Sequence, residues 1–349
     1  MRFSEKVEMA ACSDHSASIG GRQPAVSLSV VIPNYNHSRF VRESLGSILT
    51  QRRPADQLIV VDDASTDESI SVILEVIEKA PNAKLVRNEK NMGAVASMNR
   101  GLTLATGDLV FFGAADDVYY PRLFELGAAM LAVYPEAALF SGTSDIIDID
   151  GANKGRFMSP KPLAQPGFLG PAAALREMLR DDGWFMGNTV LYRRSTLLAA
   201  GGFDEKLGAF TDGYMCRLLA LRHGACFTPE TLAAWRRLEG GVASSQALRT
   251  DQANDFVAFV KERMTETGGL FPPQYIYRWQ RRYLFGGLRF ALMHSKSTQS
   301  GVTGRLKRGF NTLKILWLFL VLRPWDIGTV SGRWIREFWD RKFLHQKVI

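Results

Sequence analysis

Four apolar runs recur along the first third of the chain and alternate with segments of helical periodicity. They cover residues 27–33, 57–61, 83–87 and 109–112. Runs of this kind are typical of strands buried on both faces of a sheet. Strands and helices that alternate at this spacing build right-handed crossover units. The pattern therefore predicts an α/β fold with a mostly parallel sheet flanked by helices.

Three helices are expected between these strands. They span residues 38–50, residues 68–79, and the segment from the loop at 88–93 to about residue 106. In the first helix, four apolar residues are assigned to the buried side: Phe40, Leu45, Ile48 and Leu49.

The pattern becomes less regular beyond residue 121. A helix is expected to reach about residue 134, and residues 155–170, rich in Pro and Gly, are expected to form a loop. Further elements are expected as strands at 137–141, 145–150 and 187–192, and as helices at 194–200 and from residue 210.

Composition is that of an ordinary globular protein, with 349 residues, 46% of them hydrophobic and 22% charged. Cys12, Cys216 and Cys226 show neither metal-site spacing nor a disulfide framework, which favours a reducing, cytoplasmic location. Residues 1–26 lack the apolar centre of a signal peptide and are expected to be a flexible leader. No apolar run approaches the roughly 18 residues of a membrane span.

The net charge of +8 is concentrated at the C-terminal end. From Arg278 onward the chain contains 15 Lys and Arg residues but three acidic residues, so the rest of the chain is slightly acidic. Within residues 305–325, basic residues surround the apolar run 315–322, a pattern that suits an anionic membrane interface. The alternative is a helix packed on the rest of the chain. We predict a helical, basic extension over residues 241–349 that contacts a membrane surface.

Pairs of carboxylates follow two of the buried strands. Asp62 and Asp63 come after residues 57–61, and Asp116 and Asp117 come after residues 109–112. The carboxyl ends of parallel strands form the edge at which such sheets bind ligands. Two carboxylates approached by small residues suit a hard divalent cation that carries a phosphate. Neighbouring residues point in opposite directions, so the two members of a pair are expected to differ in role.

A structural alternative assigns one aspartate in each cluster, Asp67 or Asp117, to a helix cap. Capping explains one carboxylate per cluster, not two. A dinucleotide-binding Rossmann domain is disfavoured, because no G-x-G-x-x-G follows the first strand.

Four motifs in this order resemble those of family-2 glycosyltransferases with the GT-A fold. They are VVIPNYN at 30–36, VVDDASTD at 60–67, NMG followed by MNRGL and ATGD at 91–108, and AADD at 114–117. The resemblance runs from about residue 27 to 227, and we place the corresponding domain at residues 27–240. It implies transfer of a sugar from a nucleotide-diphosphate sugar to an acceptor hydroxyl, with Mg²⁺ or Mn²⁺ as cofactor.

The resemblance also implies roles for single residues. It places the sugar donor's nucleotide on Pro33, Tyr35, Asp63, Asn91 and Asp116, and the metal ion on Asp117. Asp63 would contact the nucleobase, and Asp116 the nucleotide-sugar. Asn99 would flank the nucleobase, and the alternative is a helix-packing or capping residue. The usual Gly of the second motif is Ala64 here.

Asp212 opens a helix shortly after the segment GGFD at 201–204, which is also common in this family. The resemblance makes Asp212 the general base of a single displacement with inversion, and an N-cap is the alternative. Relatives often carry an aromatic-Arg-x-His segment, but Leu238 stands here where His is expected. Glu239 or a water could replace that His. Arg236 or Arg237 could neutralise the diphosphate or simply be solvated.

Two other functions fit parts of the sequence. A nucleotidyltransferase would also pair aspartates with a metal, but residues 33–39 lack its Gly-rich loop. A non-catalytic basic binding protein fits the pI of about 9.4, but no nucleic-acid-reading motif is present. We therefore expect a glycosyltransferase of polysaccharide or glycolipid synthesis, with a sugar or lipid-linked acceptor and no nucleic-acid partner. It is expected on the cytoplasmic face of a membrane, attached peripherally.

Overall fold

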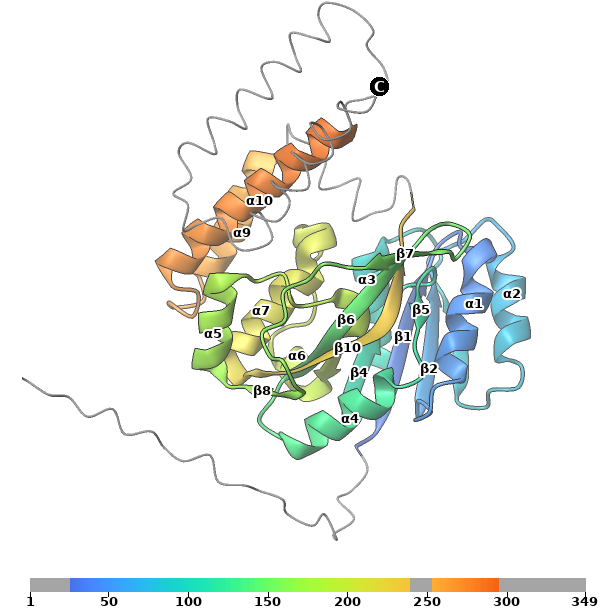
Figure 1. The fold of residues 1–349 in the computed structure, drawn as a ribbon. Helices are drawn as coiled ribbons and strands as arrows, with labels where there is room; N and C mark the ends of the chain where they lie inside the picture. The colour runs from blue at the N-terminus through green and yellow to red at the C-terminus, as the bar shows by residue number, and fades with distance from the viewer. Residues whose placement is uncertain (1–25, 239–252, 295–349) are drawn as a thin grey trace, which may run out of the picture.

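The first four predicted strands form the parallel half of a ten-stranded sheet (Figure 1). The computed structural model describes residues 26–238 and 253–294. The four strands are β1 (Leu28–Asn34), β2 (Gln57–Asp62), β3 (Ala83–Arg87) and β4 (Leu109–Phe112). They lie in the order β3-β2-β1-β4, and every neighbouring pair is parallel. The predicted α/β class is confirmed, and this half of the sheet is parallel throughout.

The other half of the sheet mixes strand directions. It contains β5 (Val118–Tyr119), β6 (Leu139–Ile147), β7 (Asn153–Arg156), β8 (Gly167–Leu169), β9 (Leu191–Arg193) and β10 (Ala225–Arg236). Strand β9 is antiparallel to both β4 and β6, whereas β10 is parallel to β6.

Three predictions for this half were wrong. One continuous strand, β6, replaces the two expected at 137–141 and 145–150. The expected loop at 155–170 includes the end of β7 and all of β8, which pairs with β10 some 60 residues further along the chain. The strand expected at 187–192 begins as the 3₁₀ helix η1 (Gly187–Thr189), and only β9 is extended. These pairings depend on distant partners, so the local pattern did not indicate them.

Helices cover both faces of the sheet (Figure 1). One face is covered by α1 (Ser38–Leu49), α2 (Ser69–Ile77) and α4 (Leu123–Val133). The other is covered by α3 (Ala94–Leu104), α5 (Pro171–Arg180), α6 (Arg194–Ala199), η2 (Glu205–Phe210), α7 (Thr211–His223), α9 (Ala253–Thr265) and α10 (Pro273–His294).

Strand β4 separates the two cores. Leu109 and Phe111 belong to the core beneath α1, α2 and α4, whereas Val110 and Phe112 belong to the opposite core. All four side chains are buried, as their apolar run predicted. Alternate residues of a strand face opposite sides, so this short run anchors both layers at the point where the chain turns toward Asp116.

The buried side of α1 differs from the prediction at three positions, because Phe40 is only half-buried, Val41 is buried and Leu49 is exposed. Val41, Leu45 and Ile48 are buried, at the three- and four-residue spacing of one helix face. Leu49 is 36% exposed and was wrongly assigned to the core. It lies one residue beyond Ile48, which turns it about 100° away from the buried face.

Helices α9 and α10 share the core of α5 and α7. The ring centroids of Trp279 and Phe210 are 5.3 Å apart, and those of Phe271 and Tyr214 are 5.8 Å apart. Residues 253–265 and 273–294 are helical, and described side chains of both helices pack on the sheet domain. The leader to residue 25 and the predicted membrane segment at 305–325 lie outside the described residues. The domain limits at 26 and 240 stay predictions.

Candidate active site

Polar side chains hold the ends of β1 and β2 together. Asn34 is in register with Asp62, and its Nδ2 donates to Asp62 Oδ1 at 2.9 Å. The other carboxylate oxygen of Asp62 accepts from the Ser65 amide at 3.0 Å. Asp62 is fully buried, so its role is to shape this edge of the sheet. Tyr35, which follows β1, is 42% exposed at the same edge.

Asp63 fastens the loop at 88–93 onto the end of β2. Its carboxylate accepts from Asn88 Nδ2 at 2.6 Å, from the Met92 amide at 2.8 Å and from the Gly93 amide at 2.7 Å. The Gly93 amide also donates to Asn91 Oδ1 at 3.1 Å. The structure therefore brings together two predicted nucleotide-binding residues, Asp63 and Asn91. Asn88 was not predicted, although its position just after β3 was the available signal.

Asp67 and Asn99 have structural roles. Asp67 accepts from the Ser38 amide, the first of α1, and from the Ser69 amide, the first of α2, both at 2.9 Å. Partial burial raises the pKa of Asp67, but these hydrogen bonds outweigh burial and lower it to about 2. Asn99 exchanges hydrogen bonds with the backbone of Phe203 at 2.8 and 2.9 Å, so it packs α3 against the GGFD segment.

The turn after β4 presents Asp116 and Asp117. Tyr119 shapes it by accepting from the Ala114 amide at 2.6 Å and donating to the Ala114 carbonyl at 3.1 Å. A Cβ on Gly113 would lie 2.6 Å from that hydroxyl, so the close approach requires glycine. Helix α4 begins only at Leu123, so the structural alternative in which Asp117 caps a helix was wrong.

The two carboxylates differ in surroundings. Asp117 is 3% exposed, and its oxygens accept from the Arg236 amide at 2.9 Å and from Asn188 Nδ2 at 3.1 Å. Burial, reinforced by the neighbouring charge of Asp116, raises the pKa of Asp117 to about 8. Burial also raises the pKa of Asp116, against the opposing charges of His37 and Arg236.

This pair suits a divalent cation. Asp117 is buried and Asp116 is half-buried. Two such adjacent carboxylates repel each other when ionised, and a doubly positive ion removes that repulsion. Their oxygens are the ligands that Mg²⁺ prefers, and Mn²⁺ accepts the same type. Asn188 Oδ1, beside Asp117, is buried without a hydrogen-bond partner among the described residues.

The Arg236 side chain is held by hydrogen bonds to other residues of the protein. Its side chain is 1% exposed, and it donates to the Asp116 and Asp148 carbonyls at 2.8 and 3.0 Å and to Glu43 Oε2 at 2.5 Å. Neither expectation for Arg236, a solvated side chain or a free partner for the diphosphate, fits this burial. Arg237 is exposed. Leu238 ends a described segment, and Glu239 lies outside it.

Asp212 is the second residue of α7, and its carboxylate faces η1. Phe210 is the N-cap, so the alternative of Asp212 as the cap was wrong. Asp212 Oδ1 accepts from the Gly213 amide at 2.6 Å, and a Cβ on Gly187 would lie 2.4 Å from Oδ2. Burial raises the pKa of Asp212, although Arg217 opposes the shift. A carboxylate with a raised pKa is the better proton acceptor.

A buried ionic cluster joins the segment before η1 to α7 and α10. Arg217 Nε donates to Asp182 Oδ2 at 3.1 Å, and its Nη2 donates to the Asp182 carbonyl at 2.8 Å. Tyr275 and Arg282, both on α10, contact the same carboxylate at 2.8 and 3.2 Å. Sequence reasoning missed this cluster, because its partners lie 35 to 100 residues apart.

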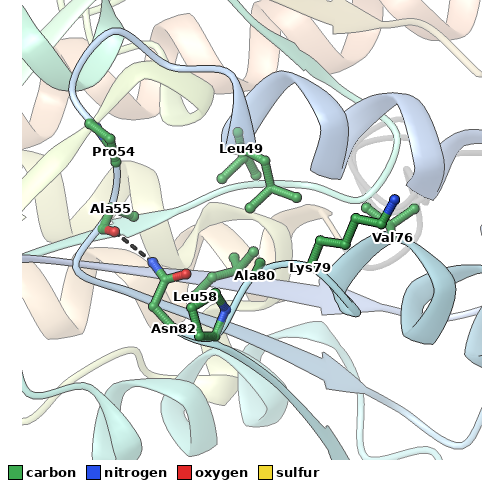
Figure 2. A pocket seen from close by; sticks show the side chains of 10 residues that line it. Leu49, Pro54, Ala55, Leu58, Val76, Lys79, Ala80 and Asn82 are labelled. Carbon is green, nitrogen blue, oxygen red and sulfur yellow. Dashed lines mark hydrogen bonds between the residues drawn. The ribbon is translucent and has the colours of Figure 1, made fainter.

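A cavity of about 350 Å³ lies at the opposite end of β2 (Figure 2). It is bounded by the last residues of α1 and α2 and by Pro54, Ala55 and Asn82, whose amide donates to the Ala55 carbonyl at 2.7 Å. Parallel sheets bind ligands at the carboxyl ends of their strands, so this cavity is not part of the site.

Comparison with known proteins agrees with the family resemblance seen in the sequence. The model of the family "Glycosyl transferase family 2" matches residues 29–186. An uncharacterized protein of Mycobacterium tuberculosis is 30% identical over 220 residues, which cover 60% of this chain and 66% of that protein. The amylovoran biosynthesis glycosyltransferase AmsE of Erwinia amylovora is 25% identical over 206 residues, or 58% and 74% of the two chains.

A solved structure shares the fold. The mannosyltransferase PcManGT from Pyrobaculum calidifontis, in complex with GDP-Man and Mn²⁺, superimposes with a TM-score of 0.55 at 20% identity. The aligned region covers 91% of this chain and 89% of that one. Matches to curated relatives are shorter, and the chain spans between 28% and 66% of the length of three of them.

Proposed function

Because the chain belongs to glycosyltransferase family 2 through residues 29–186, we propose that it transfers a sugar from a nucleotide-diphosphate sugar to an acceptor hydroxyl. The observation that supports this most directly is that Asp117 and Asp212 both lie against the short helix η1. Asn188 contacts Asp117, and its neighbour Gly187 adjoins Asp212. A metal-binding carboxylate and a basic carboxylate thus border one short segment.

The sugar donor would lie along the carboxyl edge of β1, β2 and β4. Pro33 and Tyr35 would line the nucleotide, and Asp63 and Asn91 would hold the base, on a loop fixed by three hydrogen bonds to Asp63. Asp116 would contact the nucleotide-sugar. Asp117 would hold Mg²⁺ or Mn²⁺, which stabilises the negative charge of the leaving diphosphate when bound.

Asp212 would act as the general base. Its Oδ2 accepts the proton of the acceptor hydroxyl as that oxygen bonds to the anomeric carbon and the bond to the diphosphate breaks. This is a single displacement with inversion. Burial raises the pKa of Asp212 and so strengthens it as a base.

The acceptor proposed is a sugar or a lipid-linked sugar of polysaccharide or glycolipid synthesis. AmsE is named for amylovoran biosynthesis, and this chain resembles it over 206 residues. The basic, apolar segment 305–325 would hold the enzyme peripherally on the cytoplasmic face of an anionic membrane. No nucleic-acid partner is proposed. No helix in the described part of the chain is both long enough and apolar enough to cross a bilayer.

The test is a panel of nucleotide-sugars, with binding measured by calorimetry and hydrolysis by release of the nucleoside diphosphate. At least one donor should bind in the presence of Mn²⁺ or Mg²⁺ and lose affinity when EDTA is added. Asp117→Ala should abolish this metal-dependent binding, whereas Asp255→Ala, at an exposed position on α9, should not change it. Unchanged binding by Asp117→Ala would remove Asp117 from the site.

A further inference from the structure

Asn188 has an amide oxygen that nothing in the described structure satisfies. Its Nδ2 donates to Asp117 Oδ2 at 3.1 Å and to Ser144 Oγ at 3.2 Å, while its Oδ1 is buried without a partner. A buried acceptor left unpaired costs roughly 1–3 kcal/mol. The amide of Asn188, beside the proposed metal carboxylate, is therefore not fully satisfied in this orientation.

The proposed metal site lacks a ligand that the resemblance leads one to expect. Leu238 stands where the resemblance leads one to expect His, and a hydrocarbon side chain cannot bind a cation. No group of three or more His, Cys, Asp and Glu side chains that could hold a metal is found within residues 26–238 and 253–294. The polar side chain that the structure places on Asp117 is instead an amide, that of Asn188.

On the basis of the proposed function, we propose that Asn188 is a ligand of the divalent ion held by Asp117 and serves in place of the expected His. An amide oxygen is a hard ligand suited to Mg²⁺ and Mn²⁺. The 3.1 Å between the Asn188 amide and Asp117 Oδ2 matches the separation of about 3 Å between neighbouring ligands of an octahedral ion with bonds of about 2.1 Å.

A half-turn of the amide plane makes this ligation possible. The oxygen and nitrogen of an amide exchange places on rotation about the last side-chain torsion. Without an ion, the NH₂ group faces the Asp117 carboxylate, as hydrogen bonding requires. With a cation on Asp117, the oxygen faces it instead. Ser144 adapts because its rotatable hydroxyl, whose single hydrogen can now reach either the Asp145 or the Ala233 carbonyl, can donate to the amide oxygen instead.

The experiment measures metal binding and needs no sugar donor. Mn²⁺ alone is titrated into the full chain, and free Mn²⁺ is followed by electron paramagnetic resonance. Asn188→Ala should weaken Mn²⁺ binding at least tenfold, whereas Asn188→Asp, which keeps an oxygen, should bind at least as tightly. Asn82→Ala removes an amide hydrogen bond at the far end of the sheet and should leave Mn²⁺ affinity unchanged. Thermal melts of all variants confirm folding.

Co²⁺ distinguishes a ligand from a residue that only orients Asp117. Asn188→His should change the visible absorption spectrum of the Co²⁺-loaded protein, because nitrogen replaces oxygen at the ion. An unchanged Co²⁺ spectrum, or an unchanged Mn²⁺ affinity in Asn188→Ala, would overturn the proposal while leaving the proposed function standing. A wild-type chain that binds neither ion, alone or with nucleotide, would overturn the metal-dependent function as well.

Discussion

Gly187 approaches Asp212 so closely that a Cβ on Gly187 would lie 2.4 Å from Asp212 Oδ2, and a side chain there would have to displace the carboxylate. Gly187→Ala is therefore expected to push the carboxylate out of position. A misplacement of about 1 Å can lower a catalytic rate about 10²-fold. We expect the transfer rate to fall by about that factor, while binding of the nucleotide-sugar, measured by calorimetry, stays within a few-fold of wild type.

Gly46→Ala is the matched control for this substitution. Gly46 lies inside α1 with no atom within 4 Å of a Cβ. Alanine should leave transfer unchanged there and stabilise the helix by roughly 0.5–1 kcal/mol. Normal transfer by Gly187→Ala would mean that Asp212 tolerates displacement and is not the base.

Asp212→Asn tests the base directly. Asparagine keeps the size and the acceptor oxygen that receives the Gly213 amide, so the variant should fold. Loss of the basic carboxylate should lower transfer roughly 10²–10⁴-fold. Because burial raises the pKa of Asp212, wild-type transfer should decline as the pH falls through that raised value. The slow residual transfer by Asp212→Asn should not show this decline at low pH. Near-normal turnover with an unchanged melting temperature would contradict the role.

Ala64 occupies a conformation that favours glycine. Its φ is 61°, in the left-handed region, in the loop between Asp63 and Ser65. The resembled family usually has Gly here, and the structure gives the reason: a Cβ in this conformation costs roughly 1–2 kcal/mol. Glycine loses more chain entropy on folding, which offsets part of that gain. Ala64→Gly should therefore stabilise the protein by up to about 1 kcal/mol in urea unfolding. A destabilised variant would show that the loop contacts matter more than the backbone strain.

The sequence predicted well what is local. The buried run at 109–112 indicated a strand with two covered faces, and its order among helices indicated the parallel half of the sheet. Asp63 and Asn91 were chosen from the motifs, and both accept a hydrogen bond from the Gly93 amide. They lie together because each follows one of two neighbouring parallel strands, whose ends meet at one edge of the sheet. Periodicity alone also located α1, though not which of Val41 and Leu49 is buried.

What could not be predicted depends on pairs far apart in sequence. Asn188 meets Asp117 across 71 residues, and in the sequence it looks like part of a strand. The sequence predicted an exposed side chain for Arg236. In the structure β10 runs beside β6, and the Arg236 side chain is buried against Asp116 and Glu43. Only the assembled sheet brings these residues together.

Asp182 ties α10 to the proposed catalytic helix. Burial raises the pKa of Asp182, but the charges of Arg217 and Arg282 outweigh burial and hold it below its ordinary value. The stabilisation is therefore present above the pKa of the unfolded chain, about 4, and is lost as the pH falls through the lower folded value. Asp182→Asn leaves Arg217 without its charged partner and should cost roughly 3–5 kcal/mol at pH 7.

The measurement for Asp182 is urea unfolding at pH 7 and at lower pH. The difference between wild type and Asp182→Asn should shrink as the pH falls below 4. Tyr275→Phe removes one hydrogen bond to the same carboxylate and should cost only about 1–3 kcal/mol. A loss near zero in Asp182→Asn would mean that the cluster does not hold α10 on α7.

The segment at 305–325 lies outside the described residues, and its prediction is argued from sequence. Eight consecutive apolar residues, 315–322, would extend about 12 Å as a helix, well short of a hydrocarbon core of about 30 Å. They can lie in the interface, where each nearby Lys or Arg contributes about 1 kcal/mol on anionic lipid and less at high salt.

The full chain should therefore float with liposomes containing anionic lipid at low salt and dissociate as salt is added. A full-length variant with Lys307, Arg308 and Lys314 changed to Glu should stay in the soluble fraction, whereas Lys79→Glu on the sheet domain should float normally. If the wild type also stays soluble at low salt, the segment does not bind anionic membranes.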